Sequence, residues 1–129
     1  WLLRCGPDHW RFDSDFFLYY EDEDLCARVL QARRSVLIAP AAQATHANRG
    51  SVKGKSVLHA EWRRGYHHSR SKILFMGKHR STEQARRTRQ RGLWLGGLEL
   101  AVRLLTLQPR LIARSAGRWA GTWSAPCPH

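Results

Sequence analysis

The sequence has 129 residues and a formal net charge of +12 at pH 7, because 22 Lys and Arg residues face only 10 Asp and Glu. A hydrophobic content of 43%, with 10% aromatic residues, is that of a folded chain and excludes an intrinsically disordered one. The three cysteines are an odd number at wide spacing, which argues against a disulfide framework and fits a reducing compartment.

The charge is distributed very unevenly along the chain. Seven of the ten acids lie between Asp8 and Asp24, whereas the segment from Arg63 to Arg91 has ten basic residues and one acid, Glu83. A basic segment of this kind can meet nucleic acid, anionic lipid headgroups or a nucleotide diphosphate, and charge alone does not choose among them.

The first strongly patterned stretch joins an aromatic run to four consecutive acids. Phe16–Tyr20 is rich in strand-favouring aromatic residues, and apolar residues recur at helical spacing from Leu25 onward. The acids therefore fall where a strand or turn gives way to a helix. Asp22 is expected as the N-cap, with Glu23 and Asp24 in the first turn, and helix capping by itself would account for all four acids.

The same stretch also resembles a known enzyme family. Phe12-Asp13, followed by FFLYYEDEDLCAR at positions 16–28, is similar to the segment F-D-x-x-F-F-x-Y-x-E-D-x-D-L-x-x-R that precedes the acceptor site in family 2 glycosyltransferases of the rhamnosyltransferase-like branch. The resemblance implies an α/β fold, namely the C-terminal portion of a GT-A fold with short strands and helices, followed by a basic helical tail. The chain departs from the family at positions 9–11, where His-Trp-Arg stands in place of the usual Gly-Gly.

The resemblance also implies roles for the acidic residues. Asp22 matches the general base, and Glu21 and Asp24 would hold acceptor hydroxyls or orient Asp22, with Tyr20 contacting the substrate. Crowding by neighbouring carboxylates raises the pKa of Asp22 while the helix N-terminus lowers it, and the sequence does not decide between these effects. Direct displacement assisted by one base implies inversion at the anomeric carbon.

The next segment predicts a buried strand and a metal ligand. Ser35–Ala39 is an apolar run stopped by Pro40, and a second extended piece leads to His46. A lone histidine at such a place is more often a hydrogen-bonded surface residue than a ligand, but the resemblance implies that His46 helps to bind a divalent metal, Mg or Mn. Gly50 and Ser51 resemble the small residues that let a backbone pass close to phosphate.

A long helix is expected after Ser56, which is placed to cap it. Its segment YHHSRSKILFMGKH at positions 66–79 resembles a family segment that ends in Lys-His. Arg70 and Lys72 would reach a diphosphate or an acidic headgroup, and a solvated basic helix face is the alternative. The adjacent pair His67-His68 is not expected to bind metal, because neighbouring residues on a helix point about 100° apart.

The capping-box pattern from Ser81 to Gln84 predicts another helix, which runs into the apolar stretch Leu93–Leu107. This stretch is shorter than the roughly 20 residues needed to span a bilayer. Its flanking arginines and tryptophan suit a helix that lies on a membrane or closes over a catalytic domain, with ordinary core packing as the alternative. Pro109 should end the helix, and Arg110–Trp123 would add a short amphipathic turn or two.

These patterns divide the chain into three parts. Residues 1–80 would be the acceptor-side half of a glycosyltransferase domain, residues 81–123 a basic amphipathic helical tail, and residues 124–129 a frayed C-terminus. Because the chain begins with Trp1 and its only methionine is Met76, we expect a nucleotide-binding half to precede it. Asp13-Ser14-Asp15 has the spelling of a metal motif but belongs to the F-D-x-x-F-F segment. The isolated chain is therefore expected to be inactive.

The function expected from the resemblance is metal-dependent, inverting transfer of a sugar from a nucleotide-diphosphate donor, with dTDP-rhamnose one such donor. The acceptor would be a hydroxyl of a cell-envelope or lipid-linked glycan, and the site cytoplasmic, at the inner face of the cell membrane, with peripheral contact to anionic lipid. One alternative is a basic nucleic-acid-binding module, favoured by the pI of 11.0 but not by the clustered acids, and no nucleic acid is expected on the first reading. A third is a fragment that acts only at a membrane surface.

Overall fold

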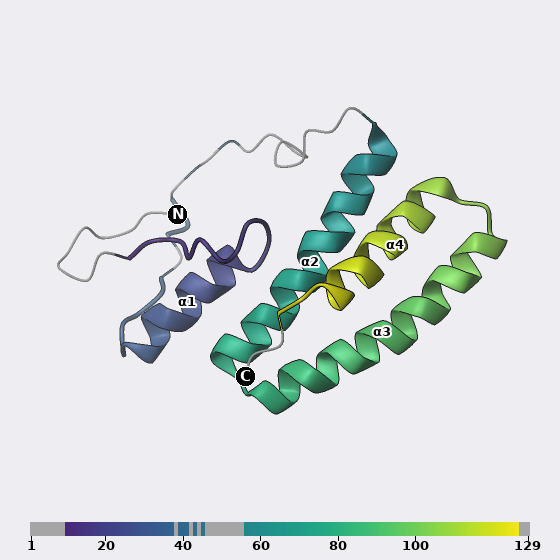
Figure 1. Ribbon diagram of the computed structural model, residues 1–129. Helices are drawn as coiled ribbons and strands as arrows, with labels where there is room; N and C mark the ends of the chain where they lie inside the picture. Colours follow the sequence, from purple (N-terminus) through teal and green to yellow (C-terminus); the bar gives the residue numbers. More distant parts are fainter. Residues whose placement is uncertain (1–9, 38, 42, 44, 46–55, 127–129) are drawn as a thin grey trace.

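The computed structural model describes residues 10–37, 39–41, 43, 45 and 56–126. Four helices follow one another along the chain (Figure 1): α1 (Glu21–Gln31), α2 (Val57–His79), α3 (Thr82–Leu105) and α4 (Pro109–Trp123). They hold 70% of these residues, and the described part contains no strand. The expected α/β, GT-A-like fold is therefore wrong for the described chain, which is a packed all-α helical bundle.

The aromatic run expected as a strand forms a turn instead. Tyr19 and Tyr20 both have left-handed backbone conformations, with φ of 67° and 68°, which an extended strand does not allow. Their rings pack edge-on or tilted against His68 of α2, with centroids 5.6 and 5.8 Å away. Aromatic residues favour strands only where a neighbouring strand offers a pleated surface, and here a helix offers the packing surface.

The second expected strand, Ser35–Ala39, is also absent where it is described. Val36 and Leu37 are 40% and 85% exposed, so this apolar run is not buried. A strand needs a neighbour to accept its backbone hydrogen bonds, and the described residues supply none. Ile38, in the middle of the run, lies outside the described residues.

The predicted starts of the two long helices are confirmed. The Ser56 hydroxyl accepts the backbone N–H of His59, and the Ser81 hydroxyl accepts that of Gln84, both at 3.1 Å. These bonds satisfy N–H groups that have no partner within the helix. A break near Pro109 was expected and is present, but α3 already ends at Leu105, and Pro109 begins α4, where its missing N–H is harmless.

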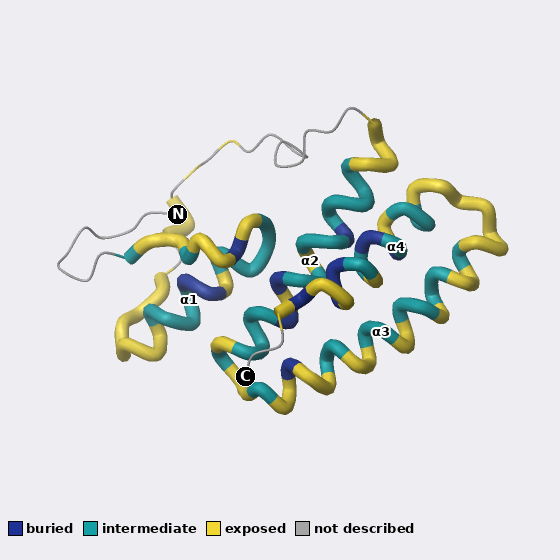
Figure 2. Tube along the Cα trace, viewed as in Figure 1, coloured by how far each residue is buried: buried dark blue, intermediate teal, exposed yellow. Residues whose placement is uncertain are grey.

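Helices α2 and α4 contact each other backbone to backbone. A Cβ atom built on Gly117 would lie 2.1 Å from the carbonyl oxygen of Trp62, and one built on Gly121 would lie 2.1 Å from that of Tyr66. From the other side, a Cβ on Gly65 would lie 2.2 Å from the carbonyl oxygen of Arg114. Figure 2 shows buried positions along this seam of α2 and α4. Only glycine permits so close an approach, so these three positions set the distance between the helices.

The apolar core beside this seam is small. Ile73, Ala85 and Ala125 form a buried cluster with Met76 packed against it. Helix α1 buries Leu25 separately. With little apolar area buried, the glycine contacts and the polar contacts described below carry a large share of the packing specificity.

We expect Gly117→Ala to lower the free energy of unfolding by about 1–3 kcal/mol, because the added methyl would force α2 and α4 apart. This loss exceeds the gain of about 1 kcal/mol that alanine brings to a helix interior. Gly97→Ala is the matched control, since its Cβ would meet Trp119 at an ordinary 3.6 Å and the variant should be as stable as the parent or more so. Urea denaturation followed by circular dichroism measures both, and equal stability of the two variants would contradict the close contact.

Candidate active site

The four acids all lie in the first turn of α1, as expected for Glu23 and Asp24, but Asp22 is not the N-cap. The cap position is Tyr20, which makes no side-chain cap bond, and the helix begins at Glu21. The left-handed conformation of Tyr20 brings the chain into the helix two residues earlier than the expected cap, which leaves Asp22 inside it. Asp22 Oδ1 accepts the N–H of Glu23 at 3.0 Å. Carboxylates in a first turn are favoured by the helix dipole.

Three of these acids line a partly open hollow of about 270 Å³ between α1 and α2. Its lining residues are Tyr19, Tyr20, Glu21, Asp22, Glu23 and His68. The chain is held against α2 just before the hollow, because the buried Ser71 hydroxyl donates to the carbonyl oxygen of Leu18 at 2.9 Å. We call the turn at Tyr19 and Tyr20 the tyrosine turn. This turn and α2 together hold the carboxylates in fixed positions along the hollow.

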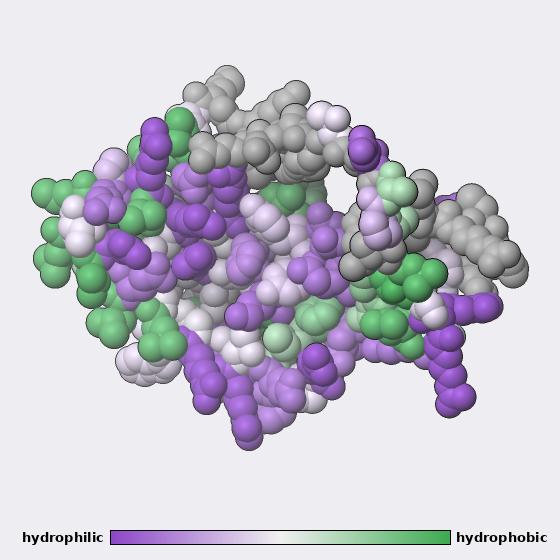
Figure 3. Space-filling view, turned by 180° about the vertical axis from the view of Figure 1, so that it is seen from behind, coloured by the Kyte–Doolittle hydropathy of each residue, from purple (hydrophilic) through white to green (hydrophobic). Residues whose placement is uncertain are grey.

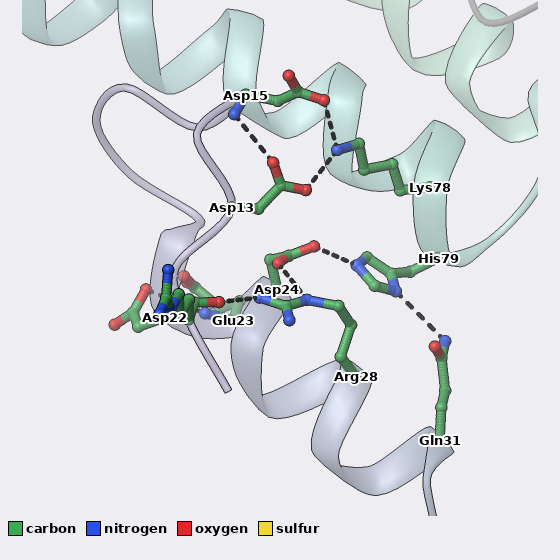
Figure 4. A network of polar contacts seen from close by, with 10 residues as sticks. Asp13, Asp15, Asp22, Glu23, Asp24, Arg28, Gln31, Lys78 and His79 are labelled. Atoms are coloured by element: carbon green, nitrogen blue, oxygen red, sulfur yellow. Dashed lines mark hydrogen bonds and ion pairs between the residues drawn. The ribbon is translucent and has the colours of Figure 1, made fainter. Parts of the chain in front are cut away.

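Asp24 lies apart from the hollow, in a buried ion-pair network. Its side chain is only 1% exposed, with Oδ1 2.7 Å from Nε2 of His79 and Oδ2 accepting from Nε of Arg28 at 2.8 Å. The amide nitrogen of Gln31 lies 3.2 Å from Nδ1 of His79 (Figure 4). A histidine with its hydrogen on Nε2 satisfies both contacts. Asp24 thus fastens α1 to the last turn of α2 rather than facing a substrate.

A second polar contact fastens the segment before the hollow to the same end of α2. Lys78 Nζ lies 2.5 Å from a carboxylate oxygen of Asp13 and 2.6 Å from one of Asp15 (Figure 4). The hydrogen bond from Lys78, helped by the backbone N–H of Asp15, lowers the pKa of Asp13. Burial lowers the pKa of Lys78, but the hydrogen bonds to the two aspartates outweigh it, and the net shift is upward. Lys78 therefore binds Asp13 and Asp15, and the neighbouring His79 binds Asp24.

The titratable side chains that line the hollow have pKa values shifted in different directions. Hydrogen bonding between the side chains of Asp22 and Glu23 lowers the pKa of Asp22 and raises that of Glu23, and burial adds to the rise at Glu23. Burial, together with the charges of Arg118, Lys72 and Arg114, lowers the pKa of His68. At neutral pH the hollow therefore presents an ionised Asp22 beside a neutral imidazole.

One carboxylate oxygen among the residues that line the hollow has no partner. Glu21 lines the hollow, and its Oε2 atom is buried without a hydrogen-bond partner among the described residues. An unsatisfied buried acceptor costs roughly 1–3 kcal/mol, a cost that a donor group placed in the hollow would remove. Hydroxyl groups are donors of the required kind.

The structure brings together some of the residues marked in the sequence and separates others. Tyr20, Glu21 and Asp22 share the hollow, whereas Asp24 does not line it. Arg70 and Lys72 lie on α2 outside the lining, although the charge of Lys72 reaches His68.

The residues marked for metal and phosphate, His46, Gly50 and Ser51, lie outside the described residues. Among those that are described, no three His, Cys, Asp or Glu side chains are grouped to bind a metal ion. The described part of the chain therefore contains no such group of side chains for Mg or Mn.

Three residues of the hollow, Tyr19, Glu23 and His68, were missed in the sequence. His68 was set aside as half of an adjacent histidine pair, yet this residue alone faces the tyrosine turn, and Glu23 was assigned only to the helix dipole. The helical spacing of His68, Lys72 and Phe75 gave a signal that they share a face of α2. No pattern in the sequence indicated that Tyr19 and Tyr20 would pack on that face.

Comparison with known proteins gives no relatives: no family model, no curated protein and no solved structure matches this chain.

We expect Asp24→Asn to lower the free energy of unfolding of the α1 region by about 3 kcal/mol, because it leaves Arg28 beside a buried site without its counter-charge. Asp22→Asn is the matched control and should change stability by less than about 1 kcal/mol, since Asp22 is partly exposed. Hydrogen exchange of the α1 amides measures both changes. If Asp24→Asn exchanged no faster than Asp22→Asn, the anchoring role of Asp24 would be wrong.

Lys78→Met should lower stability by about 1 kcal/mol near neutral pH. The folded-state pKa of Asp13 is depressed, so its contribution is present above 3.8 and is lost as the pH falls through the folded value. The folded-state pKa of Lys78 is raised, so its contribution is present below 10.5 and is lost as the pH rises through the folded value. The difference in free energy of unfolding between parent and variant should therefore disappear at acid pH. Urea denaturation at several pH values measures it.

The control for this series is Lys72→Met, which removes an exposed lysine from the same helix. If Lys78→Met lowered the free energy of unfolding by the same amount at acid and neutral pH, the lysine would act through its aliphatic chain and not through the aspartates.

Proposed function

We propose that the hollow at the start of α1 holds a hydroxyl-bearing acceptor in a sugar-transfer reaction, with Asp22 as the general base. The proposal joins the resemblance of residues 12–28 to family 2 glycosyltransferases with the carboxylate wall of the hollow. The proposal does not assume a GT-A fold, since the described chain has no strand.

The observation that carries the proposal is the unpartnered Oε2 atom of Glu21. Glu21 is one of the residues that line the hollow, together with Tyr20, Asp22, Glu23 and His68. A sugar hydroxyl would donate to Glu21 while a neighbouring hydroxyl approaches Asp22. Tyrosine and histidine rings suit the apolar faces of a sugar ring, and carboxylates suit its hydroxyl edge.

The chemistry assigned to the hollow is activation of the attacking hydroxyl. As the hydroxyl oxygen forms a bond to the anomeric carbon, its proton passes to the carboxylate of Asp22 and the bond to the nucleotide diphosphate breaks on the opposite face. The lowered pKa of Asp22 keeps it ionised at neutral pH and ready to accept the proton, although it also makes it a weaker base. The backbone N–H of Glu23, which donates to Asp22 Oδ1 at 3.0 Å, holds the Asp22 carboxylate in place.

The donor and the metal enter the proposal only through the resemblance. A nucleotide-diphosphate sugar such as dTDP-rhamnose would be the donor, and a cell-envelope or lipid-linked glycan the acceptor. The metal role implied for His46 lies outside the described residues, so no step is assigned to a metal.

The binding part of the proposal is testable on the chain itself. In ¹H–¹⁵N NMR titrations with simple methyl glycosides, including methyl rhamnoside, we expect shifts confined to residues 19–23 and 68. Glu21→Gln and Asp22→Asn should weaken this binding at least about fivefold, because each removes a charge-assisted acceptor. Glu83→Gln, which alters an exposed first-turn carboxylate of α3 outside the hollow, should bind as the parent does. Glycoside binding unaffected by both hollow variants would refute the proposal.

The same variants separate sugar binding from the nucleic-acid alternative. A basic nucleic-acid-binding module would bind generic RNA or DNA with a steep dependence on salt, and Asp22→Asn would not weaken that binding. Fluorescence anisotropy with a labelled oligonucleotide measures it. Salt-dependent oligonucleotide binding without any response to glycosides would favour the alternative.

A further inference from the structure

Helix α3 changes character along its axis. Its first half, up to Gly92, is polar and rich in arginine, whereas its second half, from Leu93, is almost entirely apolar. Helix α4 packs against only one side of this second half, so large hydrophobic side chains remain exposed on the others. The exposed residues of the second half are Trp94, Leu95, Leu98, Val102, Leu104 and Leu105. A helix that is apolar around its circumference normally lies in an apolar environment.

Three exposed leucines lie together at the turn between α3 and α4. Leu105 is 84% exposed and Leu107 is 81% exposed, and Leu104 lies beside them. We call Leu104, Leu105 and Leu107 the hairpin tip. Figure 3 shows hydrophobic side chains gathered at this end of the molecule, on the left of that view, with hydrophilic ones between them. The tip projects away from the acidic hollow and from α1 (Figure 1).

Behind the tip, side chains of α3 and α4 join the two helices. Trp119 of α4 packs beside Gly96 and Gly97 of α3, so this ring lies roughly 12 Å from the tip at 1.5 Å per helical residue. Farther along, Arg89 of α3 donates to the backbone carbonyl of Trp123. Leucines that enter the apolar region, with arginines and tryptophans near the interface, are a pattern seen in proteins that bind bilayer surfaces.

The positive charge of α3 and α4, which form a helical hairpin, favours binding to an anionic surface. After residue 83 the chain has eight arginines and one acid, Glu99. That acid is held by Arg118 at 3.4 Å and Arg103 at 3.8 Å, and it also accepts from the Ser115 hydroxyl. The arginines nearest the start of α4, Arg110 and Arg114, are exposed. A second copy of this surface would bring like charges together, whereas anionic lipid headgroups would neutralise them.

We propose that the hairpin tip inserts into the headgroup region of an anionic bilayer, with the flanking arginines bound to lipid phosphates. No helix in the described part of the chain has the length and apolar character needed to cross a bilayer, so the insertion is shallow. The surface lies on α3 and α4, and the inference is independent of the sugar-transfer proposal.

The test is flotation of the full 129-residue chain with vesicles of phosphatidylcholine, with and without phosphatidylglycerol. The chain should float with the anionic vesicles and remain at the bottom with the neutral ones. Leu105→Gln should lower the bound fraction about tenfold, since it removes an exposed apolar side chain that would enter the bilayer, without changing the charge. Leu37→Gln is the matched control, because Leu37 is 85% exposed but lies after α1, and this variant should float as the parent does.

Circular dichroism of both variants checks that the fold is intact, which is expected because both side chains are already exposed. Flotation of Leu105→Gln equal to that of the parent would overturn the proposal, as would failure of the parent to float. A concentration-dependent dimer that Leu105→Gln dissociates, with no vesicle binding, would assign the tip to a second copy instead and would equally overturn it.

Discussion

The arrangement of this protein depends on how closely α4 approaches α2. At Gly117 and Gly121 the backbone of α4 comes so near the carbonyl groups of Trp62 and Tyr66 that a methyl group would overlap them. This contact fixes the position of α4, and α3 follows because it is joined to α4 by a short turn at residues 106–108. The face of α2 turned away from this seam is then left to receive α1 and the segment before it.

That second face is held by charge more than by apolar packing. Lys78 and His79, adjacent at the end of α2, bind Asp13, Asp15 and Asp24. These three acids are thereby drawn to the end of α2, and Glu21, Asp22 and Glu23 are left lining the hollow beside His68. Burying Asp24 in an ion pair specifies how α1 sits, because an unpaired charge at that position would be strongly unfavourable.

The two proposed surfaces lie at different ends of this arrangement. The hollow presents carboxylates with one unsatisfied acceptor, which suits a neutral, hydroxyl-rich ligand. The hairpin tip presents leucines with arginines beside them, which suits an anionic lipid surface. The separation of charge along the chain thus becomes a separation in space.

By itself the sequence determined the local features. The hydroxyls of Ser56 and Ser81 start helices, the chain breaks near Pro109, and Glu23 and Asp24 occupy a first turn, because each feature depends only on neighbours within a few residues. The sequence also indicated Tyr20, Glu21 and Asp22 as a group. Only the tertiary structure decided whether the aromatic run became a strand, since strand formation needs a partner and Tyr19 and Tyr20 found α2 instead. It likewise decided that Asp24 turns from the hollow to His79, 55 residues away, and that His68 faces the acids, because contacts over such separations leave no periodic signal in one sequence.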